Sequence, residues 1–95
     1  MVIAQLSIAP VGKEVSLHQY VQLVIDILKK EQICFETNAM ATVIQTNDLA
    51  TLFSVVHKAH QAVIDAGADR VITELKIDDR RDKQASMHSK ISALQ

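Results

Sequence analysis

Polar side chains stand at alternate positions of several segments that are otherwise rich in aliphatic and β-branched residues. Carboxylates occur at Glu36, Glu74 and Asp78, and an ammonium group occurs at Lys76. Because side chains on a strand alternate between its two faces, these groups are expected to share one face of a sheet. That face is also expected to hold the neutral residues Gln5, Ser7, Asn38 and Gln45. Groups that accept, donate and offset charge at one place are typical of binding a small polar molecule.

Catalysis and metal binding have weaker support in the sequence. His57 and His60 are three residues apart on a helical segment, but no third ligand has a fitting spacing. His60 also falls on the apolar stripe, which favours a packed histidine. Cys34 has no neighbour that would activate a thiolate, and Ser7 lies outside any nucleophile elbow. An enzyme is therefore the weakest reading, and we predict no catalytic residue, no metal ligand and no cofactor.

The composition is that of one small globular domain. The chain has 95 residues and a mass of 10.5 kDa, and 48% of its residues are apolar. A formal net charge of −1 argues against a dedicated nucleic-acid binder, which would carry a basic face. The apolar runs are too short to span a membrane, and the N-terminus does not resemble a signal peptide. A single cysteine excludes an intramolecular disulfide, so a reducing cytoplasm is the expected compartment.

Hydrophobic periodicity predicts the elements that would position these side chains. Alternating apolar and polar residues predict strands over residues 2–9, 33–38, 41–46 and 70–78. Pro10 and Gly12 are expected to end the first strand, and Asn38-Ala39-Met40 to join the middle two as a hairpin.

Helical spacing of apolar residues predicts three helices. The first begins at the capping residue Ser16, and the second lies between a cap at Asn47 or Asp48 and a left-handed Gly67. A short terminal helix over residues 83–95 has an apolar line of Met87, Ile91 and Leu94. The order β-α-β-β-α-β predicts a single ferredoxin-like α+β domain over residues 1–95. Both main helices would then cover one face of a four-stranded antiparallel sheet.

The other face of this sheet is either solvated or covered, and the sequence leaves both alternatives open. Solvation is the default for an antiparallel sheet. Ile3, Val43 and Ile72 lie on the same face, however, and favour a cover formed by an oligomer or a ligand. The charged segment 76–83 alternates in sign and is expected to form local ion pairs, with Asp82 as a possible cap for the terminal helix.

Four segments together carry a family resemblance: residues 3–12 (IAQLSIAPVG), 40–44 (MATVI), 66–71 (AGADRV) and 76–81 (KIDDRR). The chain resembles the small thiamine-binding protein family of ferredoxin-like proteins over nearly its whole length. The resemblance implies a non-enzymatic cytoplasmic protein that forms homodimers or homotetramers through its sheets. It also implies binding of thiamine or of its pyrimidine moiety. A ligand-free assembly or regulatory protein of the same fold is the alternative.

Thiamine joins a cationic thiazolium to an aminopyrimidine that both donates and accepts hydrogen bonds. Carboxylates can offset the cation, and hydroxyls and amides can meet the ring nitrogens. On this basis the expected ligand-binding residues are Ser7, Glu36, Asn38, Thr42, Gln45, Glu74, Lys76 and Asp78. Thr42 has the opposite strand parity and would need a bulge to join the others.

The chain also departs from the family pattern. Members commonly read Met-Gly-Thr and Ile-Glu-Gly where this sequence has Ala41 between Met and Thr and has Gln45-Thr46 after Ile. Lys13 adds a positive charge after the first strand. A lost carboxylate and a gained lysine should both weaken binding of a cation. If Gln45 lines the site, Gln45→Glu is expected to tighten thiamine binding.

Overall fold

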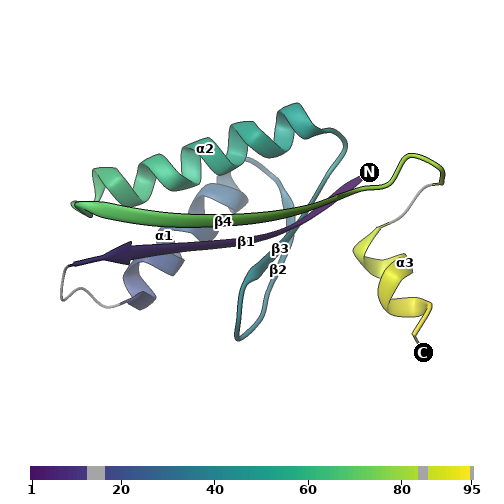
Figure 1. Ribbon diagram of the computed structural model, residues 1–95, viewed down its shortest axis with the longest axis horizontal. Helices are drawn as coiled ribbons and strands as arrows, with labels where there is room; N and C mark the ends of the chain where they lie inside the picture. Colours follow the sequence, from purple (N-terminus) through teal and green to yellow (C-terminus); the bar gives the residue numbers. More distant parts are fainter. Residues whose placement is uncertain (13–16, 84–85, 95) are drawn as a thin grey trace.

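A computed structural model describes residues 1–12, 17–83 and 86–94 of the chain (Figure 1). The cap predicted at Ser16 and the charge at Lys13 lie outside these described residues. The elements in chain order are β1 (Val2–Val11), α1 (Leu17–Lys30), β2 (Cys34–Thr37), β3 (Thr42–Thr46), α2 (Leu49–Asp65), β4 (Arg70–Asp79) and α3 (Met87–Ser92).

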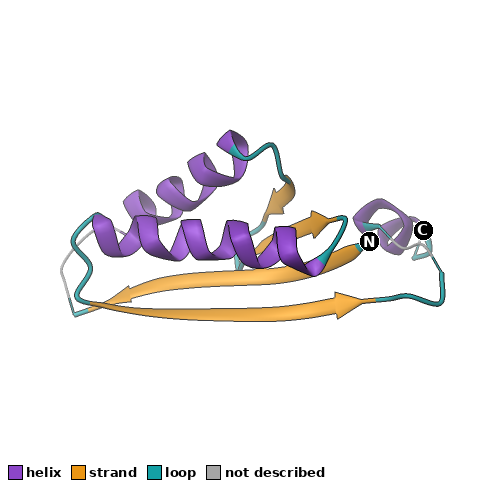
Figure 2. Ribbon diagram, turned by 90° about the horizontal axis from the view of Figure 1, so that it is seen from above, coloured by secondary structure: helices purple, strands orange, loops and turns teal. Residues whose placement is uncertain are grey.

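The strands form a four-stranded antiparallel sheet in the order β2-β3-β1-β4. Helices α1 and α2 lie together on one side of this sheet (Figure 2). Two β-α-β units whose first strands are central and antiparallel neighbours define the ferredoxin-like arrangement. The predicted fold class is therefore confirmed.

Strand parity decides which residues form the core. Val2, Ala4, Leu6 and Ile8 of β1 are all buried toward the helices, whereas Gln5 and Ser7 between them are exposed. Leu28 of α1, Ile44 of β3 and Leu52 of α2 have no measurable exposure. We call the side of the sheet away from α1 and α2 the open face; it holds the other parity, with Ile3 and Val43 half-buried and Ile72 44% exposed.

Local signals set most of the boundaries as expected. Asp48 caps α2 because its side chain accepts a hydrogen bond from the Thr51 N–H at 2.7 Å. Gly67 follows the helix with φ of 107°, a conformation that favours glycine. In the hairpin, the Asn38 side chain accepts hydrogen bonds from the N–H groups of Met40 and Ala41 at 2.8 and 2.9 Å. This Asx turn replaces the glycine signal that the sequence lacks.

Two predicted boundaries are wrong. Strand β1 does not end before Pro10 but runs to Val11, since past Leu6 it pairs with β4 alone and proline is tolerated at such an edge. The terminal helix spans Met87–Ser92 rather than 83–95, because Ser86 and Ser89 form a capping box that starts it. Asp82 is not its cap.

Candidate functional site

A cavity of about 190 Å³ lies where β1 continues past the end of β3, under the first half of α1. Its walls are uncharged among the described residues. The lining comprises Leu6, Ser7, Ile8, Ala9, Val21, Val24, Thr37, Asn38, Ala39, Met40, Ala41 and Thr42. It therefore offers mainly aliphatic surface with a few hydroxyl and amide groups, which is the usual make-up of a small-molecule pocket.

The unequal lengths of the strands create this cavity. Pairing between β1 and β3 ends at Leu6 and Thr42, where the hairpin turns away. Beyond that point β4 is the strand that pairs with β1 among the described residues, so alternate backbone N–H and C=O groups of residues 7–11 point toward the side that β3 has left. Small side chains at Ala39 and Ala41 leave the space open. Backbone donors and acceptors thus border an aliphatic hollow.

The polar side chains of the cavity come from the β2–β3 hairpin. Thr37 and Thr42 are opposite each other in the hairpin, and their hydroxyl oxygens are 3.3 Å apart. Asn38 begins the turn that carries Met40, whereas Ser7 borders the cavity from β1 with its side chain on the open face. Hydroxyls both donate and accept, so this set can meet a flat ring that carries nitrogen acceptors and an amino donor.

The structure brings three of the eight predicted ligand-binding residues together at this cavity, namely Ser7, Asn38 and Thr42. Thr42 does so without a bulge: it is 7% exposed and faces the helices, not the open face. Its expected place beside the open-face residues is therefore corrected, because β3 keeps regular alternation through Ile44 to Thr46. Its role toward a ligand stays a prediction.

The other five predicted residues lie on the open face, outside the cavity lining. Glu74 is directly opposite Ser7 in the β1–β4 register, and Lys76 is opposite Gln5. Glu36 is on the edge strand β2, opposite Val43. Since directly opposed side chains of an antiparallel pair are about 5 Å apart at Cβ, Glu74 is the predicted carboxylate placed beside a cavity residue.

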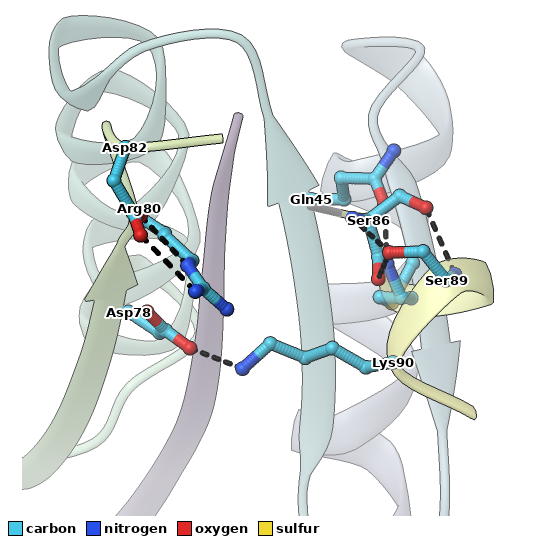
Figure 3. Close-up of polar contacts among 8 residues, drawn as sticks. Gln45, Asp78, Arg80, Asp82, Ser86, Ser89 and Lys90 are labelled. Carbon is cyan, nitrogen blue, oxygen red and sulfur yellow. Dashed lines mark hydrogen bonds and ion pairs between the residues drawn. The ribbon is translucent and has the colours of Figure 1, made fainter. Parts of the chain in front are cut away.

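Gln45 and Asp78 are already engaged by the terminal helix (Figure 3). The Gln45 Oε1 accepts a hydrogen bond of 2.8 Å from the backbone N–H of Met87. The Lys90 ammonium donates to the Asp78 carboxylate, and this hydrogen bond together with the lysine charge lowers the pKa of Asp78. These two residues therefore bind α3 in this structure.

The lining residues Leu6, Ile8, Val21 and Val24 were predicted only as strand and helix residues of the core, not as part of a binding site. Aliphatic residues at strand and helix spacing predict a core and do not show where the core stops. The one available hint was the short strand over residues 41–46 beside the longer strand over residues 2–9, since strands of unequal length leave an unpaired edge.

His60 and Cys34 are the remaining candidates for chemistry, and neither lies in the cavity lining. His60 Nδ1 lies 2.6 Å from the Thr73 hydroxyl between α2 and β4, which agrees with a packed histidine. Cys34 is a free, exposed thiol. Within residues 1–12, 17–83 and 86–94, no three His, Cys, Asp or Glu side chains gather where a metal ion could be held.

The charged segment after β4 forms the ion pairs that its alternating signs predict. The Arg80 guanidinium donates two hydrogen bonds to the Asp82 carboxylate, at 2.7 and 3.1 Å. Arg81 donates to Asp79 at 2.9 Å. These contacts lower the pKa of Asp82 and raise the pKa values of both arginines. The pairs are solvent-exposed and contribute little to stability.

Comparison with known proteins gives the family. The family model described as thiamine-binding protein matches residues 4–95. The chain belongs to this thiamine-binding protein family. A UPF0045 protein of Methanothermobacter thermautotrophicus is 40% identical over 95 residues, covering 99% of this chain and 96% of the relative.

Solved structures agree with that membership. The crystal structure of a hypothetical protein from Methanocaldococcus jannaschii superposes with a TM-score of 0.89 at 40% identity, covering 98% of this chain and 94% of that one. A Thermotoga maritima protein, described as a candidate for thiamine biosynthesis or salvage, reaches a TM-score of 0.82 at 16% identity and covers 99% and 98% of the two chains. At that identity the second likeness shows the fold alone. In the described part of this thiamine-binding family member, no helix is long and apolar enough to cross a membrane.

Proposed function

We propose that this protein binds the aminopyrimidine moiety of thiamine, or free hydroxymethylpyrimidine, in the cavity beside β1. The observation that carries the proposal is an uncharged hollow of about 190 Å³ whose polar groups are hydroxyls, an amide and the β1 backbone beyond its pairing with β3. Membership of the thiamine-binding protein family supports the same ligand class. A flat neutral ring fits such a lining better than a charged group does, since an unpaired charge is costly to remove from water.

The thiazolium half of thiamine would lie outside the cavity. Glu74, opposite Ser7 on the open face, is the carboxylate placed to offset its charge. Gln45, which stands where family members commonly carry a glutamate, does not line the cavity, so its substitution removes no charge from this pocket. In this account the departure at Gln45 leaves ligand binding intact.

The protein acts without chemistry on its ligand, as a cytoplasmic binding module that needs no cofactor. Support comes from the cavity walls, whose described residues include no acid, base or thiol side chain. A cavity without such groups can hold and shield a ligand, but it offers no positioned nucleophile or general base.

Self-association through the open face is the second part of the proposal. Ile3 and Val43 are only half-buried there, and Ile72 is 44% exposed. A second copy covering these side chains would remove apolar surface from water, which is favourable. A homodimer, or a homotetramer built from two such dimers, would follow.

Isothermal titration calorimetry with hydroxymethylpyrimidine and with thiamine tests the ligand proposal. The informative variant is Val21→Phe, which places a ring in the cavity from a half-buried position on α1. Its matched control is Val56→Phe, a half-buried valine on α2 that does not line the cavity. We expect Val21→Phe to weaken binding about tenfold or more, and Val56→Phe to leave it unchanged.

An equal loss of ligand affinity in both variants would mean that the cavity is not the binding site. Absence of any heat or thermal shift with either ligand in the parent protein would contradict the ligand proposal altogether. The assembly or regulatory function would then be the better account. Gln45→Glu belongs in the same series, with unchanged affinity expected because Gln45 is outside the cavity.

A further inference from the structure

Helix α3 lies on the open-face side at one end of the sheet and is held there by contacts with β3 and β4. Its first residue, Met87, donates its backbone N–H to Gln45 on β3 at 2.8 Å, and Lys90 donates to Asp78 on β4. Strand β1 lies between β3 and β4, so the two anchors hold α3 across three strands. Figure 3 shows the Lys90 side chain reaching over β1 toward Asp78. In Figure 1, α3 lies below the sheet at one end and α2 runs above it.

The attachment of α3 is weak compared with the packing of α1 and α2. The helix has six residues, and a helix this short is not stable by itself in water. Met87 is buried, but Ile91 is 47% exposed and Leu94 is 88% exposed. The Lys90–Asp78 pair is about half exposed on both partners and is screened by salt. The helix can therefore detach while the core of β1–β4, α1 and α2 stays folded.

A docked α3 competes with any second sheet for this end of the open face. Its Met87 N–H occupies the Gln45 Oε1 as a hydrogen-bond acceptor, and its Lys90 ammonium pairs with the Asp78 carboxylate. The charges along the open face of β4 alternate in sign, in the order Arg70, Glu74, Lys76, Asp78. A strand with alternating charges can meet opposite charges on a copy of itself related by a two-fold axis, so a second copy of this chain is the partner that fits.

We propose that α3 is a detachable clasp, anchored at Gln45 and Asp78, that limits the access of a second copy to the open face. Release of the clasp frees both anchors and uncovers the apolar side chains near them. The inference rests on the self-association part of the proposed function and is independent of the ligand in the cavity. It predicts that high salt, which weakens the ion pair, favours the released state.

The test uses the full chain and changes only α3, so that the open face itself keeps its residues. The double variant Met87→Ala, Lys90→Met removes the buried side chain and the ion pair. The matched control Met87→Leu, Lys90→Arg keeps an apolar side chain and a cation at the same positions. Hydrogen–deuterium exchange of residues 86–92 reports the clasp, and analytical ultracentrifugation reports self-association.

We expect the alanine–methionine variant to exchange its α3 amides about tenfold faster and to associate about tenfold more tightly, with the control matching the parent. Unchanged exchange would show that the Met87 side chain and the Lys90–Asp78 pair do not hold the helix. Faster exchange with unchanged or weaker association would show that the helix does not limit access. A mass that stays at 10.5 kDa in every sample would overturn the gating and the self-association together. Thiamine titrations of the same samples report the ligand proposal separately, because no cavity residue is changed.

Discussion

Single side-chain oxygens fix several turns of this molecule. Asn38 holds the hairpin, Asp48 starts α2 and Ser86 starts α3, each by accepting hydrogen bonds from backbone N–H groups two or three residues further on. At a helix start these N–H groups have no partner within the helix, so the cap removes a cost of folding. The positions of the hairpin and of two helices thus depend on three short polar residues.

Asp48 gives a prediction about stability and pH. Asp48→Ala should lower the melting temperature by about 5 °C, whereas Asp48→Asn should retain most of the cap. The hydrogen bond from the Thr51 N–H lowers the pKa of Asp48 in the folded state. Its contribution is therefore complete above the unfolded pKa and is lost as the pH falls through the folded pKa.

Thermal melts at pH 7 and across the acid range measure both effects. The alanine variant should show a smaller loss of stability on acidification than the parent protein, since it has no carboxylate to protonate. An identical acid dependence in parent and alanine variant would contradict the assignment of the cap.

Helix α2 is tied to the sheet by one face only. Leu52 has no measurable exposure, while its neighbour Phe53 is 52% exposed. Leu52→Ala should therefore lower the free energy of unfolding by about 2–5 kcal/mol. Phe53→Ala should change it by about 0.5 kcal/mol or less. Urea denaturation of both variants measures the difference, and a larger effect at Phe53 would mean that α2 packs by another face.

Strands and helices were readable from the sequence because local pattern and packing agree. The alternation of Val2, Ala4, Leu6 and Ile8 specifies a core-facing strand wherever that strand is placed. The cavity was readable only in part. Ser7, Asn38 and Thr42 stand out as polar residues in or beside predicted strands, but the helical spacing of Val21 gives no sign that it lines the cavity.

Contacts between segments far apart in the sequence explain why Gln45 has a partner that the sequence does not predict. The acceptor of Gln45 is taken by the N–H of Met87, which is 42 residues away in the chain. No periodicity within the strand over residues 41–46 could reveal this partner. Strand parity correctly predicts that Gln45 lies on the open face, but there it lies beside α3 and not beside the cavity.

At the scale of the whole molecule, α3 is the one element among residues 1–12, 17–83 and 86–94 that lies on the open face. Ile3, Val43 and Ile72 are the apolar side chains that would gain most from a partner. We expect static light scattering at micromolar concentration to give at least twice the chain mass of 10.5 kDa. Ile72→Lys should shift the population toward the single chain, since it places a charge in the proposed interface. A parent protein that stays at the mass of one chain would contradict the interface.

Mapping of ligand-induced NMR shifts distinguishes binding in the cavity from binding on the open face. Amide resonances of the parent protein would be recorded during titration with hydroxymethylpyrimidine. We expect the largest shifts on residues 6–9 and 37–42, with a smaller group on α1 at Val21 and Val24. Largest shifts at Gln45, Asp78 and α3, or no shifts at a saturating concentration, would contradict binding in the cavity.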